Sequence, residues 1–102
     1  MGMAVVHGRS MLPTLVPGDR LVVRYGARPR PGALVVVRLP GDRPLAVKRA
    51  LRPEPEGWWV ERDNPSEGVD SWAVGAVPDR DVVAVVVARL WPRPSRLQRR
   101  PS

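Results

Sequence analysis

Lysine is rare in this chain, which makes its one lysine a candidate for chemistry. Sixteen of the 17 Lys and Arg residues are Arg, and the exception is Lys48. Arginine stays protonated at any usable pH, whereas a lysine taken out of water can lose its proton and act as a base. Lys48 lies in LAVKRAL (45–51), whose apolar residues are of the type that could desolvate it. Two interpretations stay open: a general base, or a structural lysine on the polar face of a strand.

Ser10 is the matching candidate nucleophile. It lies in GRSMLPTL (8–15), directly after the short apolar run AVVH (4–7). Gly8, two residues before it, permits close approach of another backbone, so a substrate carbonyl could reach the N–H groups around Ser10. The alternative is a serine in an ordinary turn.

The composition narrows the chemistry further. Cys is absent, which excludes disulfides, thiolate zinc sites and a Cys nucleophile. The single histidine, His7, cannot build a multi-histidine metal site. A Ser-Lys pair is therefore the nucleophile-base arrangement that the residues favour. We expect no cofactor and no metal.

The elements that must position these residues are short strands. The chain has 18 Val and no Phe, which favours sheets, and its 13 Pro and 9 Gly cut most of it into short runs. Candidate strands are residues 4–7, 20–25, 33–39, 45–51, 57–62 and 82–91. The pattern predicts a compact all-β domain of antiparallel sheets or a barrel, with little helix.

The charge of +7 is unevenly distributed. Residues 89–102 carry five Arg and no acid, whereas residues 1–88 carry 12 basic and 10 acidic residues. We therefore expect a domain over 1–92 and a disordered Pro/Arg-rich tail over 93–102.

A nucleic-acid partner is not expected, because the neighbouring Trp58 and Trp59 would point to opposite faces of a strand.

Targeting signals are not evident in the sequence. Apolar runs stay far below the roughly 20 residues of a membrane span. The first ten residues lack the basic start and long apolar stretch of a signal peptide. We expect a cytoplasmic protein without a membrane span.

Six motifs in order resemble the conserved boxes of the type I signal peptidase family. They are SMLPTL (10–15), PGDRLVV (17–23), PGALVVV (31–37), VKRA (47–50), DNPSEGVDS (63–71) and GAVP (75–78). The small size and the closing RLWP (89–92) look most like the soluble nickel-type superoxide dismutase maturation proteases of that family.

This resemblance implies a fold, an activity and a substrate. The fold would be a partly open β-barrel of the signal peptidase core type. The activity would be that of a serine endopeptidase that removes the N-terminal propeptide of a nickel-type superoxide dismutase. The substrate would bind as an extended strand with small side chains near the cut. Two alternatives stay open: a general preprotein protease, or a non-catalytic member that binds peptides.

The resemblance also assigns roles to individual residues. Ser10 would be the nucleophile, its backbone N–H an oxyanion-hole donor, and Lys48 the general base. Gly8 is a candidate second donor, since it stands where many members carry a hydroxyl. Further matches are Met11 and Pro13 for the substrate cleft, and Asp63, Asn64, Asp70 and Ser71 for structural support.

Three residues depart from the family pattern. Arg62 stands where a Gly is usual, and Gly68 stands where a Ser would orient the lysine amine. Trp72 replaces the Arg that would pair with Asp63. We expect Asp63 and Asp70 to lack that counter-charge unless Arg62 supplies it.

Overall fold

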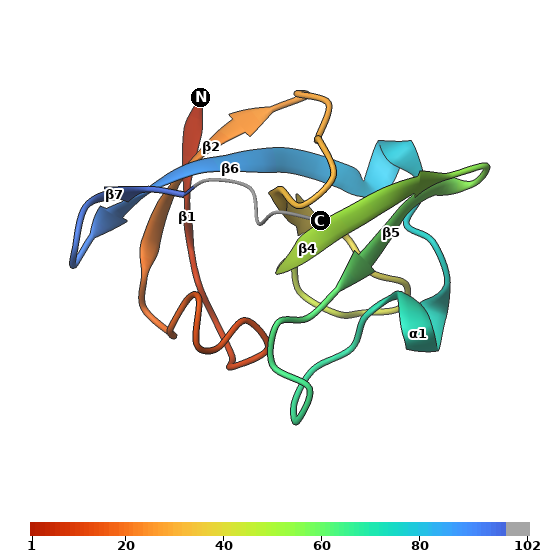
Figure 1. Ribbon diagram of the computed structural model, residues 1–102, viewed down its shortest axis with the longest axis horizontal. Helices are drawn as coiled ribbons and strands as arrows, with labels where there is room; N and C mark the ends of the chain where they lie inside the picture. Colours follow the sequence, from red (N-terminus) through yellow and green to blue (C-terminus); the bar gives the residue numbers. More distant parts are fainter. Residues whose placement is uncertain (98–102) are drawn as a thin grey trace.

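The computed structural model describes residues 1–97 of the chain. These residues form one seven-stranded sheet, in which each pair of neighbouring strands is antiparallel (Figure 1). The strands are β1 (Gly2–Val5), β2 (Arg20–Tyr25), β3 (Leu34–Val37), β4 (Ala46–Glu54), β5 (Gly57–Glu61), β6 (Val82–Trp91) and β7 (Ser95–Arg96). Two short helices, α1 (Ser71–Val74) and η1 (Asp79–Asp81), complete the fold.

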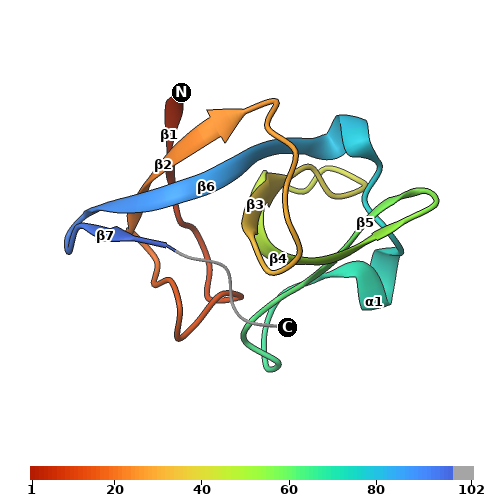
Figure 2. The same cartoon turned by 45° about the horizontal axis from the view of Figure 1, so that its top comes forward.

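The sheet curls without closing. Its order is β1-β2-β6-β3-β4-β5, with β7 added to β6, so β1 and β5 are the two edges. Figure 2 shows β4 and β5 turning away from β2 and β6, with β3 between the two parts. This confirms the predicted all-β domain with little helix.

β3 lies at the centre and divides the core in two. Its four residues are all buried because β6 and β4 flank it and side chains pack on both faces. Leu34 and Val36 join one apolar cluster with Leu21 and Val86. Val35 and Val37 join a second cluster, which contains Ala50, Trp58, Val60 and Val77. The second cluster includes Leu39, with Ala46 and Val69 packed against it, and these three residues also line the cleft described below.

Several strand boundaries differ from the prediction by one to three residues, and β7 was not predicted as a strand. β1 begins at Gly2 rather than at residue 4, since Gly2–Val5 pairs with residues 20–23. β4 continues to Glu54, beyond the predicted strand end at residue 51. The Arg52 guanidinium lies over the Trp59 ring, 5.0 Å from its centroid, and this cross-strand contact extends the β4–β5 hairpin.

The predicted tail begins with ordered contacts. Ser95 and Arg96 pair with β6, and the guanidinium Nε of Arg89 donates to the Arg93 carbonyl at 3.0 Å. Leu97 packs against the first apolar cluster. Residues 93–97 are thus part of the domain's packing, and the rest of the predicted tail, 98–102, lies outside the described residues. Within residues 1–97, no helix is long and apolar enough to cross a membrane.

Candidate active site

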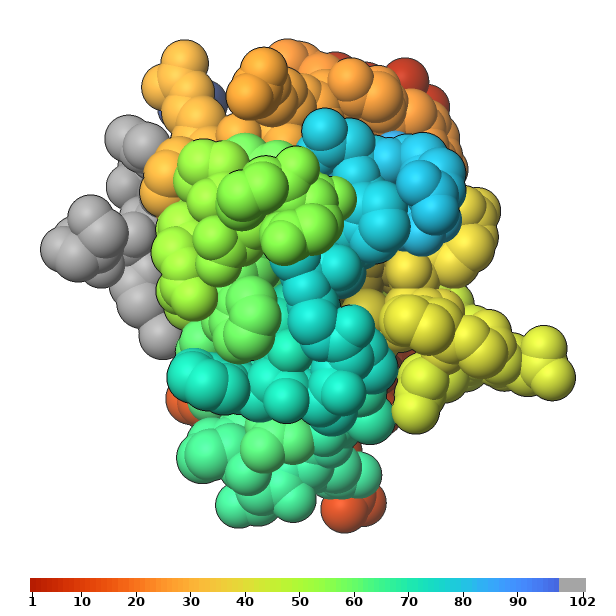
Figure 3. All heavy atoms as spheres, turned by 90° about the vertical axis from the view of Figure 1, so that its right-hand side faces the viewer, coloured from red at the N-terminus to blue at the C-terminus, as the bar shows by residue number. Residues whose placement is uncertain are grey.

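An apolar cleft of about 260 Å³ opens where three segments meet. The first segment follows β1, the second runs from the end of β3 into β4, and the third precedes α1. In Figure 3 the turn around residues 40–44 (yellow) projects beside the green and teal segment that follows β5. The lining residues are His7, Gly8, Arg9, Ser10, Leu39, Arg43, Pro44, Ala46, Lys48, Glu67, Gly68 and Val69.

Ser10 and Lys48 meet at Gly68 in this cleft. A Cβ atom built on Gly68 would lie 2.5 Å from the Ser10 Cβ and 3.4 Å from the Lys48 Nζ. The Ser10 Cβ and the Lys48 Nζ are therefore no farther apart than the sum of these two distances. A rotation about the serine χ1 angle can bring its hydroxyl toward an amine at such a separation. No hydrogen bond joins the two groups among the described contacts, as is common in the absence of substrate.

Lys48 is held in an apolar setting. It is 2% exposed and lies on β4 between Ala46 and Ala50, on the face of the second cluster. Burial lowers the pKa of Lys48 below its ordinary value of 10.5; the Asp70 carboxylate opposes this and the Arg62 guanidinium adds to it. The amine therefore deprotonates more readily than a lysine in water.

The residues that desolvate Lys48 are not its sequence neighbours. Leu45 is 50% exposed, and Val47 points to the opposite face of β4, toward the first cluster. Leu39 and Val69, which are distant in sequence, share the cleft with the amine instead. Side chains alternate along a strand, so adjacent positions cannot surround one another.

The loop that carries Ser10 is fixed by Asn64. The Asn64 backbone N–H donates to the Ser10 carbonyl at 2.8 Å, and its side-chain Nδ2 donates to the Arg9 carbonyl at 2.8 Å. Among the described residues, no acceptor takes the backbone N–H of Ser10. Gly8 also lines the cleft, with φ +76°.

Asp63 has a counter-charge that the sequence analysis missed. Arg49 forms a bidentate ion pair with it, Nη2 to Oδ2 at 2.6 Å and Nε to Oδ1 at 3.3 Å. Both side chains are nearly inaccessible, at 6% and 3% exposed. Thr14 adds a hydrogen bond from its Oγ1 to the Asp63 Oδ2 at 2.5 Å. The expected lack of a counter-charge at Asp63 is thus corrected.

Asp70 has its counter-charge in Arg62, which the sequence analysis offered as the alternative to an unpaired Asp70. The Arg62 Nε lies 3.9 Å from the Asp70 Oδ2, and the same Arg62 donates from its guanidinium to the Gly68 carbonyl. Asp70 also caps α1 through the Trp72 N–H at 3.1 Å. Ser71 is buried, and its Oγ accepts from the Val60 N–H at 2.8 Å. These contacts fix the segment that covers the Lys48 amine.

Met11 and Pro13 do not line the cleft, which corrects their prediction. Met11 is 2% exposed and packs in the first cluster, where its Sδ accepts from the Asp63 N–H at 3.4 Å. Pro13 is exposed and follows a cis peptide bond with Leu12. The loop turns after Ser10, so a large apolar residue next in sequence is directed into the core.

Thr14 and Arg49 are the site residues that residue-type reasoning overlooked. Each lies inside a quoted motif, SMLPTL or VKRA, so the signal was their position in those motifs. Arg49 is the buried arginine among residues 1–97, and the abundance of arginine in the chain gave no reason to select it. No group of three His, Asp or Glu side chains within residues 1–97 is placed to hold a metal ion.

The cleft of this open β-sheet domain thus brings together Ser10 and the buried amine of Lys48. In the comparison with protein families, the family described as Peptidase S24-like matches residues 1–87. The chain belongs to the Peptidase S24-like family, which makes it a serine peptidase by family. The match supports the serine peptidase class that the motifs implied, and it does not test the nickel-type superoxide dismutase maturation subgroup. The comparison with curated proteins found no match.

Gly68 cannot accept a side chain without moving the site. Its φ is +102°, and an added Cβ would lie 2.5 Å from the Ser10 Cβ. We expect Gly68→Ser to lower stability by about 1–3 kcal/mol and to displace Ser10. Thermal unfolding measures this. Gly18→Ala is the matched control, since Gly18 has φ +94° and open space around it. Equal melting temperatures for Gly68→Ser and wild type would contradict the close contact.

The buried amine should cost stability at neutral pH. The folded pKa of Lys48 is lowered, so the unfolded chain binds the proton more tightly and stability rises with pH between the folded value and 10.5. Lys48→Met should therefore unfold at a higher temperature than wild type near pH 7, and the difference should shrink toward pH 10.5. Lys48→Arg, which stays charged, should show no such convergence. A constant difference for Lys48→Met at all pH values would refute this account.

Proposed function

We propose that this chain is a cytoplasmic Ser-Lys endopeptidase that removes the N-terminal propeptide of a nickel-type superoxide dismutase. The observation that carries the catalytic part is the convergence of the Ser10 side chain and the Lys48 amine at Gly68. The family match supports a serine peptidase, and the Ser-Lys mechanism goes beyond it.

The chemistry follows from three groups. The Lys48 amine takes the proton of the Ser10 hydroxyl as the serine oxygen attacks the scissile carbonyl carbon. The backbone N–H of Ser10 donates to the oxyanion that forms. The Lys48 ammonium then returns the proton to the leaving amine, and an acyl-enzyme ester remains. Water, activated by the same amine, hydrolyses the ester and frees Ser10.

The sheet offers a free edge for an extended substrate. β4 pairs with β3 over residues 46–49, whereas β5 pairs with β4 only from Arg49 onward. Residues 46–48 therefore have no strand on their other edge among the described pairings, and this edge includes cleft-lining positions. A peptide that adds as a strand here would pass Lys48 with its main chain hydrogen-bonded to β4.

The dismutase proprotein as substrate rests on the sequence resemblance. The ordered motifs and the closing RLWP (89–92) are what this chain shares with the maturation proteases. The Trp91 ring lies 5.2 Å from the Arg20 guanidinium, so this segment belongs to the β2–β6 ladder and lies outside the cleft lining. The resemblance of RLWP (89–92) therefore supports a relationship to that subgroup. It does not assign this segment a role in catalysis.

Cleavage should require a removable proton at residue 48. We expect wild type to shorten a nickel-type superoxide dismutase proprotein at its N-terminus, as measured by mass of the product. Lys48→Arg and Ser10→Ala should both reduce the rate at least about 1000-fold, because base and nucleophile act as a unit. The wild-type rate should rise with pH, with a midpoint below 10.5, because burial lowers the pKa of Lys48.

Two outcomes separate the parts of the proposal. Cleavage by Lys48→Arg at the wild-type rate would end the Ser-Lys mechanism. An intact dismutase proprotein, together with cleavage of other peptides, would end the substrate assignment and keep the mechanism. Arg80→Gln is a control, since Arg80 is exposed on η1 and outside the cleft lining.

A further inference from the structure

The rim of the cleft carries two arginines without acidic partners. Arg9 and Arg43 both line it, and the ion pairs of the described residues include neither. Both residues are exposed. They come from different walls, the loop before Ser10 and the turn before β4. The cleft thus has an exposed arginine on each of two walls.

The two arginines are held differently. The Arg9 carbonyl accepts from the Asn64 amide, which fixes the Arg9 backbone beside Ser10 and leaves its side chain exposed. The Arg43 Nη1 donates to the Pro40 carbonyl at 2.5 Å, which ties this guanidinium to its own turn. A guanidinium held in this way loses less freedom than an untethered one when it binds a carboxylate.

The remaining charges around the cleft set where an acid can lie. Glu67 is the acidic residue in the described lining, and it borders Gly68 on the third wall. Asp70 and Arg62 act on the Lys48 amine from behind this wall and pair with each other. His7 lines the cleft on the Arg9 side. The carboxylate of a ligand is therefore favoured at the Arg9 and Arg43 walls and disfavoured at Glu67.

The floor of the cleft restricts the neighbouring side chain. Leu39, Ala46 and Val69 supply apolar surface beside the amine. A small aliphatic side chain fits this surface, and a large charged one would lose its hydration there. The site therefore combines an apolar floor with a cationic rim.

We propose that this peptidase selects extended segments that carry an Asp or Glu within a few residues of the cut. The selection rests on the proposed peptidase function. The carboxylate binds Arg9, Arg43 or both through charge-assisted hydrogen bonds. Neither arginine touches the reacting atoms, so both act as specificity residues.

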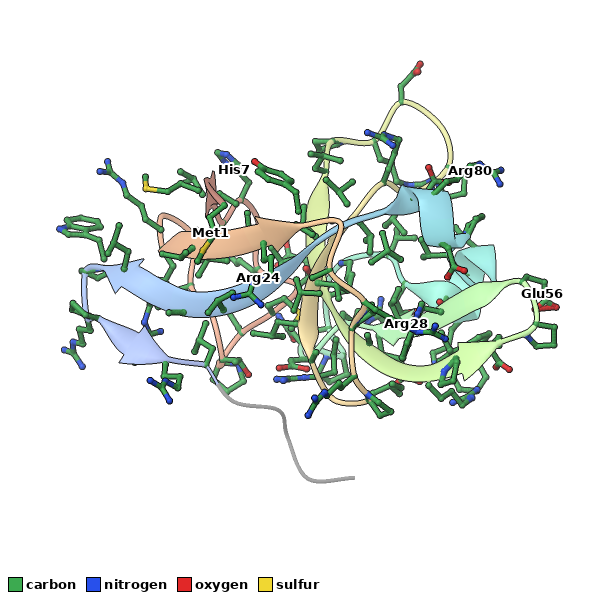
Figure 4. All side chains as sticks on the ribbon, turned by 90° about the horizontal axis from the view of Figure 1, so that it is seen from above. Met1, His7, Arg24, Arg28, Glu56 and Arg80 are labelled. Atoms are coloured by element: carbon green, nitrogen blue, oxygen red, sulfur yellow. The ribbon has the colours of Figure 1, made fainter. Side chains whose placement is uncertain are left out.

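A randomised peptide library tests the selection. An equimolar mixture of synthetic peptides is incubated with wild type, and mass spectrometry identifies the cleaved sequences. Asp and Glu near the cut should be enriched about threefold to tenfold over Asn and Gln, and less at high salt. Arg9→Glu and Arg43→Glu should each remove most of the enrichment. Arg80→Glu changes the net charge equally, and Figure 4 shows Arg80 far from His7 at the cleft.

The result has distinguishable outcomes. Cleavage by wild type without acidic enrichment would overturn the selection and leave the peptidase function standing. Equal loss of enrichment in Arg80→Glu would also overturn it, because bulk charge would then be the cause. Ser10→Ala, immobilised and exposed to the same library, reads binding without catalysis. Retention of acidic peptides by Ser10→Ala with no cleavage by wild type would support the selection and refute the peptidase function. Retention without acidic preference would refute the selection.

Discussion

The buried ion pair between Arg49 and Asp63 is the contact on which the site depends. It joins β4 to the segment after β5, and Thr14 links the same carboxylate to the loop that carries Ser10. Such a pair gains little over apolar packing, but removal of one partner strands a buried charge and costs about 3–5 kcal/mol. Because Arg49 follows Lys48 in the strand, the pair fixes Lys48 and the loop that carries Ser10 relative to each other.

Burial of Lys48 connects stability to chemistry. The apolar surroundings that lower its pKa also disfavour the folded state while the amine is charged. A structural lysine would be relieved of this cost by exposure, and an arginine could never lose its proton. The position of Lys48 on the core-facing side of β4 is thus understandable for a base and difficult to explain for a surface cation. Functional sites commonly retain such unfavourable groups.

Gly68 decides how closely the covering segment approaches the amine. The absence of a Cβ lets the segment 67–69 close directly over Ser10 and Lys48. The Arg62 guanidinium donates to the Gly68 carbonyl, and the Asp70 carboxylate attracts the amine. Glycine is the residue that permits such close backbone packing.

Sequence by itself determined the all-β class, because Val-rich runs between Pro and Gly specify strands locally. It also singled out Ser10 and Lys48 as the candidate nucleophile and base, since only a few residue types can act in these roles. The tertiary structure alone decided that Asp63 pairs with Arg49 and that Met11 faces the core. Those outcomes depend on contacts between residues distant along the chain, whereas a pattern of residue types describes only near neighbours.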